Sequence, residues 1–283
     1  MSDFDIKNRD KEKPEDTAFR IKMKWDSPAF DGKYLLLVED NDDRKCFFKF
    51  FDPKMVEFEV SRGCSRMLQI LNFIQDYKIP NFAIQDSDFA RACKCMPSKD
   101  NVFFTDFHDH EMMCLSEKDV MKALFLNNGI CFDEVLVNEV FDDLKMLSYF
   151  KWYNYSNHLN VNFDGYNPSG KETSDLRSFN SIFNAVKPQS PHCVSSISEK
   201  NILDFVKDQK EQNPFEITNG HDFLGVLSQK MKKKYKDIVH NLSDAQIRMI
   251  IYSSFTMKYF IKTKLYKSIF TWAGDMGVSL FIA

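Results

Sequence analysis

Short apolar runs alternate with segments of helical spacing in the first part of the chain. Residues 34–38 read Tyr-Leu-Leu-Leu-Val, a continuous apolar run that predicts a strand buried on both faces. The further strands that we predict cover residues 55–60, 82–85 and 102–104. The predicted helices cover residues 41–51, with Asn41 or Asp42 as N-cap, residues 67–74, and a stretch that ends near residue 126. Because strand and helix alternate, residues 31–126 are expected to form an α/β domain with a mostly parallel sheet.

The pattern changes to helical spacing after Asn127-Asn128-Gly129. The helices that we predict beyond this point cover residues 132–147, 197–210, 221–236 and 243–270. Residues 154–174 are polar and are expected to form a loop. The chain is therefore predicted to have a polar N-terminal lead-in (1–30), the α/β domain (31–126) and a mainly helical C-terminal region (127–283).

Composition excludes several classes of protein. No stretch approaches the ~20 consecutive apolar residues that a membrane span needs, and the charged N-terminus lacks an apolar signal region. The seven cysteines are an odd number spread along the chain, unlike the disulfide framework of a secreted domain. We therefore expect a cytoplasmic protein.

Charge is unevenly distributed, although the formal net charge is only −3. Between residues 230 and 267, ten Lys or Arg are opposed only by Asp237 and Asp244, whereas residues 31–125 are acidic on balance. A solvated helix face, or contact with a protein partner, explains the basic segment as well as nucleic-acid binding does. The candidates for contact with nucleic-acid phosphates are Lys232, Lys233, Lys234 and Lys236.

Acidic residues directly follow the first, third and fourth predicted strands. Parallel strands end at the same edge of a sheet, so these side chains are expected to gather there. So many carboxylates repel one another unless a cation balances them, and oxygen ligands suit a hard cation such as Mg²⁺. The sequence therefore predicts a magnesium site at this edge. The residues concerned are Glu39, Asp40, Asp42, Asp43, Asp86, Asp88, Asp106, Asp109 and Glu111.

Residues 35–41, Leu-Leu-Leu-Val-Glu-Asp-Asn, resemble the opening of a response-regulator receiver domain. That resemblance implies a phosphorylatable signalling domain in which Asp86 accepts the phosphoryl group and Thr105 is the switch residue. Three features argue against it. Too few residues, Pro97 among them, separate Asp88 from the fourth strand for a full helix. No strand ending in Lys-Pro follows at a suitable distance, and a receiver gives Asp88 and Glu111 no required role.

The same acidic residues resemble a TOPRIM domain, a Rossmann-like metal-binding domain, and we prefer this interpretation for residues 31–126. The pattern of that family is an apolar strand followed by Glu, usually Gly, two residues and Asp, with a later Asp-x-Asp. Asp40 stands where Gly is usual, which is a departure in the loop beside Glu39. The matching positions in this chain are Glu39, Asp40, Asp43, Asp86 and Asp88.

Further motifs extend the resemblance to a bacterial OLD-like TOPRIM family. They are Thr105-Asp106-Phe107-His108-Asp109-His110-Glu111, Asn219-Gly220-His221-Asp222, and the stretch from Tyr266 to Trp272. The resemblance implies a metal-dependent nuclease that cleaves phosphodiesters in DNA or in RNA such as tRNA, as a toxic effector of antiphage defence. It also implies Mg²⁺ as cofactor, with Mn²⁺ as a substitute, an ABC-type ATPase partner and a homodimer in the active state.

The resemblance also implies roles for single residues. Asp86 and Asp88 would hold one or two metal ions, and Glu39 would be a shared ligand or a general base; these three are the expected catalytic residues. Glu111 and Asp43 are the further expected metal ligands. His108 is expected to be either a proton shuttle or a structural histidine, with Asp109 in support.

Two other interpretations stay open. The chain can be a non-catalytic binding module that keeps the TOPRIM shape. Zinc is the second alternative, because cysteines and histidines cluster here, but their spacing fits no standard structural-zinc pattern. The residues in question are Cys93, Cys95, His108, His110 and Cys114. No Gly-rich phosphate loop is present, so any ATPase activity is expected to come from a partner chain.

Overall fold

The structure, a computed structural model, describes residues 12–190, 197–209 and 213–282. Residues 1–11 of the expected lead-in and Lys210 of an expected helix lie outside these ranges. The chain divides into two compact units. Unit 1 comprises Met1–Asp86, Ser98–Thr105 and Phe260–Ala283, and unit 2 comprises Ser87–Pro97 and Asp106–Tyr259. The chain thus passes between the units several times. A single boundary at residue 126 does not describe this, because hydrophobic spacing reports local elements and not which elements pack together.

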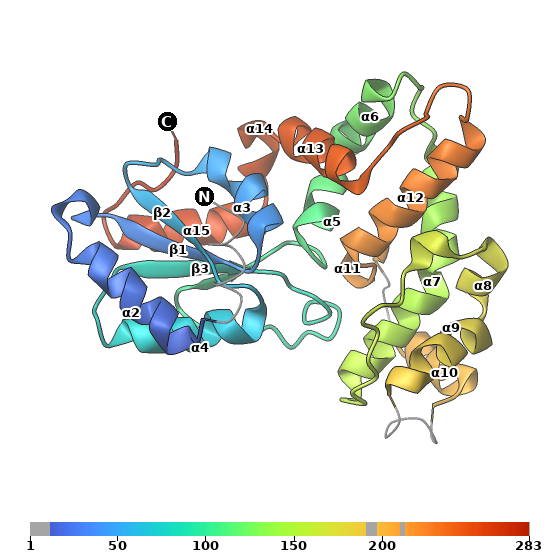
Figure 1. Ribbon diagram of the computed structural model, residues 1–283, viewed down its shortest axis with the longest axis horizontal. Helices are drawn as coiled ribbons and strands as arrows, with labels where there is room; N and C mark the ends of the chain where they lie inside the picture. Colours follow the sequence, from blue (N-terminus) through green and yellow to red (C-terminus); the bar gives the residue numbers. More distant parts are fainter. Residues whose placement is uncertain (1–11, 191–196, 210–212, 283) are drawn as a thin grey trace. The chain divides into compact units, whose positions relative to one another are not determined.

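Unit 1 is built on a four-stranded parallel sheet (Figure 1). Its strands lie in the order β2-β1-β3-β4. Leu36 in the central strand β1 pairs with Phe58 of β2 on one side and with Phe82 of β3 on the other. The predicted α/β fold with a largely parallel sheet is thus confirmed. The strands are β1 (Tyr34–Val38), β2 (Val56–Val60), β3 (Asn81–Gln85) and β4 (Val102–Phe104).

One face of the sheet is covered by helices α2 (Pro14–Trp25) and α4 (Cys64–Gln75). Leu35 and Leu37 of β1 belong to the same buried cluster as Ile21 of α2, which is fully buried. Helix α2 lies in the segment that the sequence predicts to be only a polar lead-in. The expectation missed it because charged residues surround its few apolar positions, so no helical period stands out.

The C-terminal residues return to the other face of the same sheet. Trp272 of α15 (Lys264–Asp275) lies against Phe82 and Phe103, with ring centroids 5.4 and 5.6 Å apart. The prediction of a single helix over residues 243–270 is wrong, because three helices occupy this segment. The hydroxyl of Thr263 caps the start of the last one. They are α13 (Asp244–Ser254), α14 (Met257–Phe260) and α15.

Helix α3 (Asn41–Phe47) begins directly after β1. Its N-cap is Asp40 and not the expected Asn41 or Asp42. The Asp40 carboxylate accepts hydrogen bonds from the amides of Asp42 and Asp43, and the Asp43 carboxylate accepts one from the Asp40 amide at 2.9 Å. This reciprocal capping box stabilises the first turn. The helix is shorter than the predicted span to residue 51, since a 3₁₀ turn follows it.

Unit 2 is helical, as the sequence predicts for most of it. Its longest helix, α7, extends to Ser156, so the loop expected over residues 154–174 begins three residues later than predicted, and the expected range already contains the start of α8. No helix in the described part of the chain is long and apolar enough to cross a membrane. The helices that lie wholly in unit 2 are α5 (His110–Leu115), α6 (Lys118–Asn127), α7 (Glu134–Ser156), α8 (Thr173–Arg177), α9 (Phe179–Val186), α10 (Glu199–Lys207), α11 (Pro214–Ile217), α12 (Gly220–Lys234) and α13.

We expect Phe260→Ala to lower the free energy of unfolding by about 3–5 kcal/mol. The Phe260 ring is fully buried, stacks on Phe50 at a centroid distance of 4.3 Å and also contacts Phe281. Urea denaturation of the whole chain measures the change. The matched control is Phe19→Ala, whose ring is 56% exposed and whose loss should change stability by less than about 0.5 kcal/mol. Equal effects of the two substitutions would contradict an aromatic core at Phe260.

Candidate metal centre

The two central strands of unit 1 end at the point where the strand order reverses. The chain moves outward from β1 to β2 on one side, and β3 and β4 follow on the other side of β1. In open parallel sheets, ligands bind at this point, beyond the carboxyl ends of the strands. Glu39 directly follows β1 and Asp86 directly follows β3. The topology therefore puts two of the predicted site residues where a ligand is expected.

Glu39 and Asp86 are in direct contact. The backbone amide of Asp86 donates a hydrogen bond to Oε1 of Glu39 at 3.2 Å. Both residues are partly exposed to solvent. The prediction that these two residues lie together at one edge of the sheet is confirmed.

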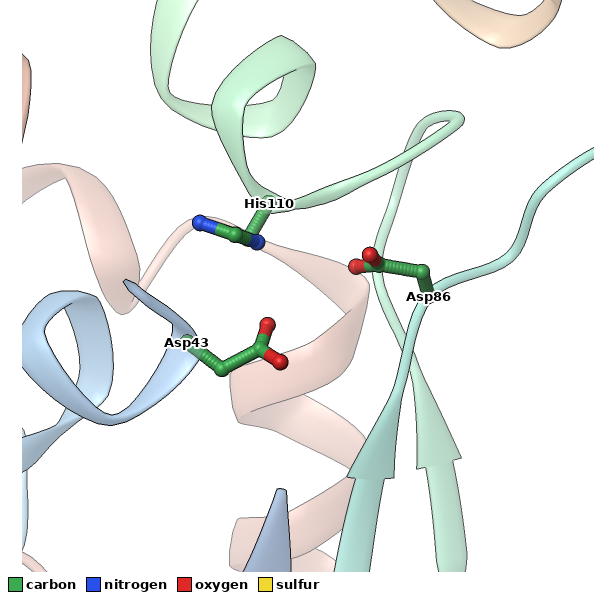
Figure 2. A group of neighbouring side chains, drawn as sticks. All are labelled: Asp43, Asp86 and His110. Atoms are coloured by element: carbon green, nitrogen blue, oxygen red, sulfur yellow. The ribbon is translucent and has the colours of Figure 1, made fainter. Parts of the chain in front are cut away.

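Asp43 brings a third carboxylate to this edge from helix α3. One of its carboxylate oxygens lies within 4.8 Å of one of Asp86, and Figure 2 shows the two groups turned toward the same space. Asp43 is only 3% exposed, and the capping box with Asp40 holds it in place. Figure 2 also labels His110, which is the first residue of helix α5 in unit 2.

The loop beside Glu39 needs no glycine. Asp40 occupies the position where the resembling family usually has Gly, but its φ of −140° and ψ of −174° are extended. Any residue adopts this conformation, so an aspartate there causes no strain. Its side chain is instead used to start α3, which in turn orients Asp43.

Carboxylates so close together have the donor set of a metal site. Mutual repulsion would disfavour their ionised forms unless a cation lies between them. Oxygen ligands from Glu39, Asp43 and Asp86 fit a hard divalent cation. The residues present at this edge could therefore hold a metal ion.

Asp88 and Glu111 differ from these residues in their surroundings. Asp88 belongs to unit 2, is exposed and has a left-handed backbone with φ of 44°, and its amide donates to the His108 carbonyl at 2.7 Å. Glu111 is fully buried in unit 2. Oε1 of Glu111 lies 3.3 Å from Nε of Arg248 and 3.4 Å from the Tyr252 hydroxyl. Metal binding by Asp88 and by Glu111 stays a prediction.

Burial raises the pKa of Glu111, while the nearby His110, His221 and Arg248 oppose that shift. Nε2 of His221 lies 3.6 Å and Nε2 of His110 lies 3.4 Å from the carboxylate. Such neighbours are what a buried carboxylate requires, since an unpaired buried charge is costly. The sequence showed His221 only as part of the Asn-Gly-His-Asp motif, and no spacing indicated Arg248 or Tyr252.

Asp109 joins the two motifs that carry the family resemblance in unit 2. Its carboxylate accepts from the Met112 amide at 2.8 Å, which caps α5, and from the Gly220 amide at 2.6 Å at the start of α12. Nδ1 of His108 lies 3.2 Å from the same carboxylate. Asp109 thus holds the N-termini of two helices, while its support of a metal site stays a prediction.

His108 is buried and packs against its neighbours. Its ring meets Phe89 edge-on at a centroid distance of 4.8 Å, and its amide donates to the Phe215 carbonyl at 3.0 Å. These contacts favour the structural role over the proton shuttle, the two roles that the sequence left open.

In the part of the chain that the structure describes, neither the lysine segment nor the cysteines form a comparable site. Lys234 lies 2.6 Å from Asp133, while Lys232 and Lys236 are exposed, so the predicted contact with nucleic acid stays a prediction. Cys93 contacts Ser156 and Trp152 at 3.1 and 3.3 Å. No cysteine is among the potential metal ligands found in the described residues.

Fold and site together define an α/β protein with an acidic, potentially metal-binding centre at the switch point of a parallel sheet. Comparison of the chain with protein-family models, with curated proteins and with solved structures finds no match.

Gly220→Ala should lower the free energy of unfolding by about 1–3 kcal/mol. A Cβ atom at Gly220 would lie 2.5 Å from Oδ1 of Asp109 and 2.6 Å from Cβ of Glu111. Gly274→Ala in α15 is the matched control, because nothing lies within 4 Å of its added Cβ; alanine is the better helix former and should stabilise by up to about 1 kcal/mol. Thermal unfolding of both variants measures the difference, and a harmless Gly220→Ala would refute the close packing of the two motifs.

Asp109→Asn is expected to cost about 1–3 kcal/mol at pH 7, because an amide nitrogen cannot accept the hydrogen bonds that the carboxylate accepts. Burial disfavours the ionised form, but contacts from His108, Gly220 and Met112 lower the pKa of Asp109 below its ordinary 3.8. The ionised carboxylate therefore stabilises the fold above pH 3.8, and this contribution is lost as pH falls through the lower folded pKa.

Urea titrations of the wild type and of Asp109→Asn at pH 3 to 7 follow this contribution. The stability difference should shrink as pH falls below about 3.8. Asp142→Asn, an exposed change in α7, should give no comparable difference at any of these pH values. If the difference in free energy of unfolding between wild type and Asp109→Asn instead grew toward low pH, Asp109 would not be held in its ionised form.

Proposed function

We propose that this protein is a Mg²⁺-dependent nuclease whose metal centre is built on Glu39, Asp43 and Asp86. The observation that carries the proposal is the approach of the Asp43 and Asp86 carboxylates to within 4.8 Å at the β1/β3 switch point, with Oε1 of Glu39 bonded to the Asp86 amide at 3.2 Å. An acidic centre whose residues Glu39 and Asp86 are partly exposed at a sheet edge suits an anionic substrate only if a metal bridges the two. Phosphodiesters are substrates of this kind.

The chain's own residues divide the chemistry between them. Asp86 and Asp43 would hold Mg²⁺, with Asp43 the more rigid because the capping box restrains it. When bound, the ion supplies charge stabilisation for the oxygens of the scissile phosphate. Glu39 is oriented by the Asp86 amide, and it would accept a proton from the attacking water. Asp88 and Glu111 are retained as contributors on the strength of the family resemblance alone.

The biological setting rests wholly on that resemblance. The motifs are similar to those of AriB, the nuclease effector of the PARIS antiphage system, which works with an ABC-type ATPase. We extend the proposal accordingly to a toxic effector that an ATPase partner controls and that acts as a homodimer. RNA, such as tRNA, is its proposed substrate, with DNA as the alternative.

A receiver domain is the second candidate, because Thr105 directly follows β4 and Asp86 directly follows β3, as a receiver requires. Two observations favour the nuclease. The described residues between β3 and β4 contain no helix, and the sheet formed by the described part of the chain has four strands. A receiver needs a fifth strand that ends in lysine. Labelling of Asp86 by acetyl phosphate would support the receiver instead.

Purified full-length chain, incubated with plasmid DNA and with total RNA in Mg²⁺ or Mn²⁺, tests the proposal. The wild type should cleave one of these substrates, and EDTA should abolish cleavage. Asp86→Asn and Glu39→Gln should each reduce the rate at least about 100-fold, since even neighbours of metal ligands typically cost 10–100-fold. Titration with Mg²⁺ in a calorimeter should show weaker binding by Asp86→Asn.

Asp76→Asn is the matched control for this experiment. The residue is exposed at the end of α4 in the same unit, so the substitution should leave cleavage and metal binding unchanged. Wild-type cleavage by Glu39→Gln would end the assignment of the centre. Mg²⁺ binding without cleavage of any nucleic acid would favour a non-catalytic binding module.

A further inference from the structure

A cavity of about 170 Å³ lies in unit 1 at the edge of the sheet that carries the acidic centre. It is lined by the end of β2, the first turn of α3 and the neighbouring faces of α2 and α4. Pockets for drug-sized ligands usually measure about 300–1,000 Å³. This cavity therefore suits a small group such as one phosphate and not a whole nucleotide.

Arginine dominates the lining of this cavity. Four arginines and two glutamates contribute to it, so the lining is cationic on balance. Arginine presents a planar fork of donors that matches phosphate oxygens, and it is always charged. The arginines are Arg20, Arg44, Arg62 and Arg66, and the glutamates are Glu12 and Glu59.

Both glutamates of the lining form ion pairs with the same arginine, Arg20. Arg20 contacts Glu59 through two nitrogens, at 2.8 and 3.3 Å, and Glu12 at 3.3 Å. Arg66 donates to the Thr17 hydroxyl at 2.7 Å, a neutral acceptor that leaves its charge uncompensated. Arg44 is exposed, and its side chain has no hydrogen bond or ion pair with the residues that the structure describes. The positive charges of Arg44 and Arg66 are therefore not neutralised by the two glutamates, and they favour binding of an anion in the cavity.

Two backbone features tie this cavity to the acidic centre. The amides of Arg62 and Gly63 donate to the Glu39 carbonyl at 2.7 and 3.1 Å. Arg62 has a φ of 68°, a left-handed conformation that costs free energy in a residue with a side chain. In α3, Asp43 and Arg44 are consecutive, so one turn of helix supplies a residue to the acidic centre and a residue to the cavity.

We infer that this cavity, hereafter the arginine cavity, binds a backbone phosphate of the nucleic-acid strand that the acidic centre cleaves. Arg44, Arg62 and Arg66 grip the phosphate, and Arg20 with its two glutamates forms the fixed wall. That the bound strand is also cleaved rests on the proposed function. Binding of the strand by the arginine cavity does not depend on it. It also places a phosphate contact in unit 1, in addition to the lysine segment that the sequence predicts.

Binding of a fluorescent single-stranded 20-nucleotide RNA, and of the same strand as DNA, tests the inference. Fluorescence anisotropy is measured in EDTA, so that no cleavage occurs. Arg44→Gln/Arg62→Gln should bind about 10–30-fold more weakly at 0.1 M salt, and its slope of log K against log salt should fall by about 0.7, the value for one lost phosphate contact on a single strand. A methylphosphonate strand has a neutral backbone, so the wild type should bind it at least as weakly as the arginine variant binds the charged strand.

Lys45→Gln/Lys54→Gln is the matched control, because it removes two exposed charges from unit 1 outside the cavity. It should leave the affinity within about twofold, as expected if those lysines contact no phosphate. Arg44→Lys/Arg62→Lys should recover part of the affinity, since the charge remains but the fork is lost. Circular dichroism verifies that each variant is folded.

The outcomes separate this inference from the proposed function. Unchanged affinity and salt slope in folded Arg44→Gln/Arg62→Gln would overturn it, even if the wild type cleaves nucleic acid. An equal loss of affinity in the lysine control would overturn it as well, because the loss would then follow from the lower net positive charge and not from the cavity. Weakened binding in the arginine variant alone supports the cavity, even if no cleavage is found and the nuclease proposal fails.

Discussion

The parallel pairing of β1 with β3 is the contact on which the arrangement of unit 1 depends. Leu36 pairs with Phe82 in the middle of the sheet, and the two strands end beside each other. Residues that are 47 positions apart in sequence, Glu39 and Asp86, therefore meet through a hydrogen bond at the strand ends. Since β1 is buried along its whole length, polar side chains can reach solvent only where that strand ends. The acidic centre follows from this geometry.

Glu39 connects the two charged features at this edge. Its side chain accepts from the Asp86 amide, and its carbonyl accepts from the turn that contains Arg62. An acidic centre alone would repel a polyanion, and a cationic cavity alone would bind one without acting on it. In the proposed nuclease, their attachment to the same residue would let a strand be held and polarised in one place. The left-handed backbone of Arg62, which is unfavourable for a residue with a side chain, belongs to the turn that joins these two features.

Unit 2 shows why motif residues need not all share one role. Asp109 and Glu111 stand two positions apart, yet Asp109 satisfies two helix N-termini while Glu111 is enclosed by cationic and hydroxyl groups. Gly220 has no room for a side chain beside them. The packing therefore explains much of the Thr-x-x-His-Asp-x-Glu and Asn-Gly-x-Asp motifs before any chemistry is invoked. The fold of unit 2 therefore depends on these motif residues.

The sequence by itself determined the elements that have a strong local signal. The apolar run 34–38 and the acidic residues after it gave the central strand and the position of Glu39, and alternation of strand and helix gave the parallel sheet. Capping was predicted one or two residues too late, because Asp40, Asn41 and Asp42 are all good caps and only the backbone selects one of them.

Only the tertiary structure decided which segments share a unit. Neither the return of Trp272 to the sheet, nor helix α2, nor the arginine cavity has a local pattern, since each depends on packing between residues far apart in sequence. The same holds for the partners of Glu111, which come from α12 and α13. Spacing reports what one helix or strand buries, whereas side chains from different elements meet only after the sheet and helices have packed.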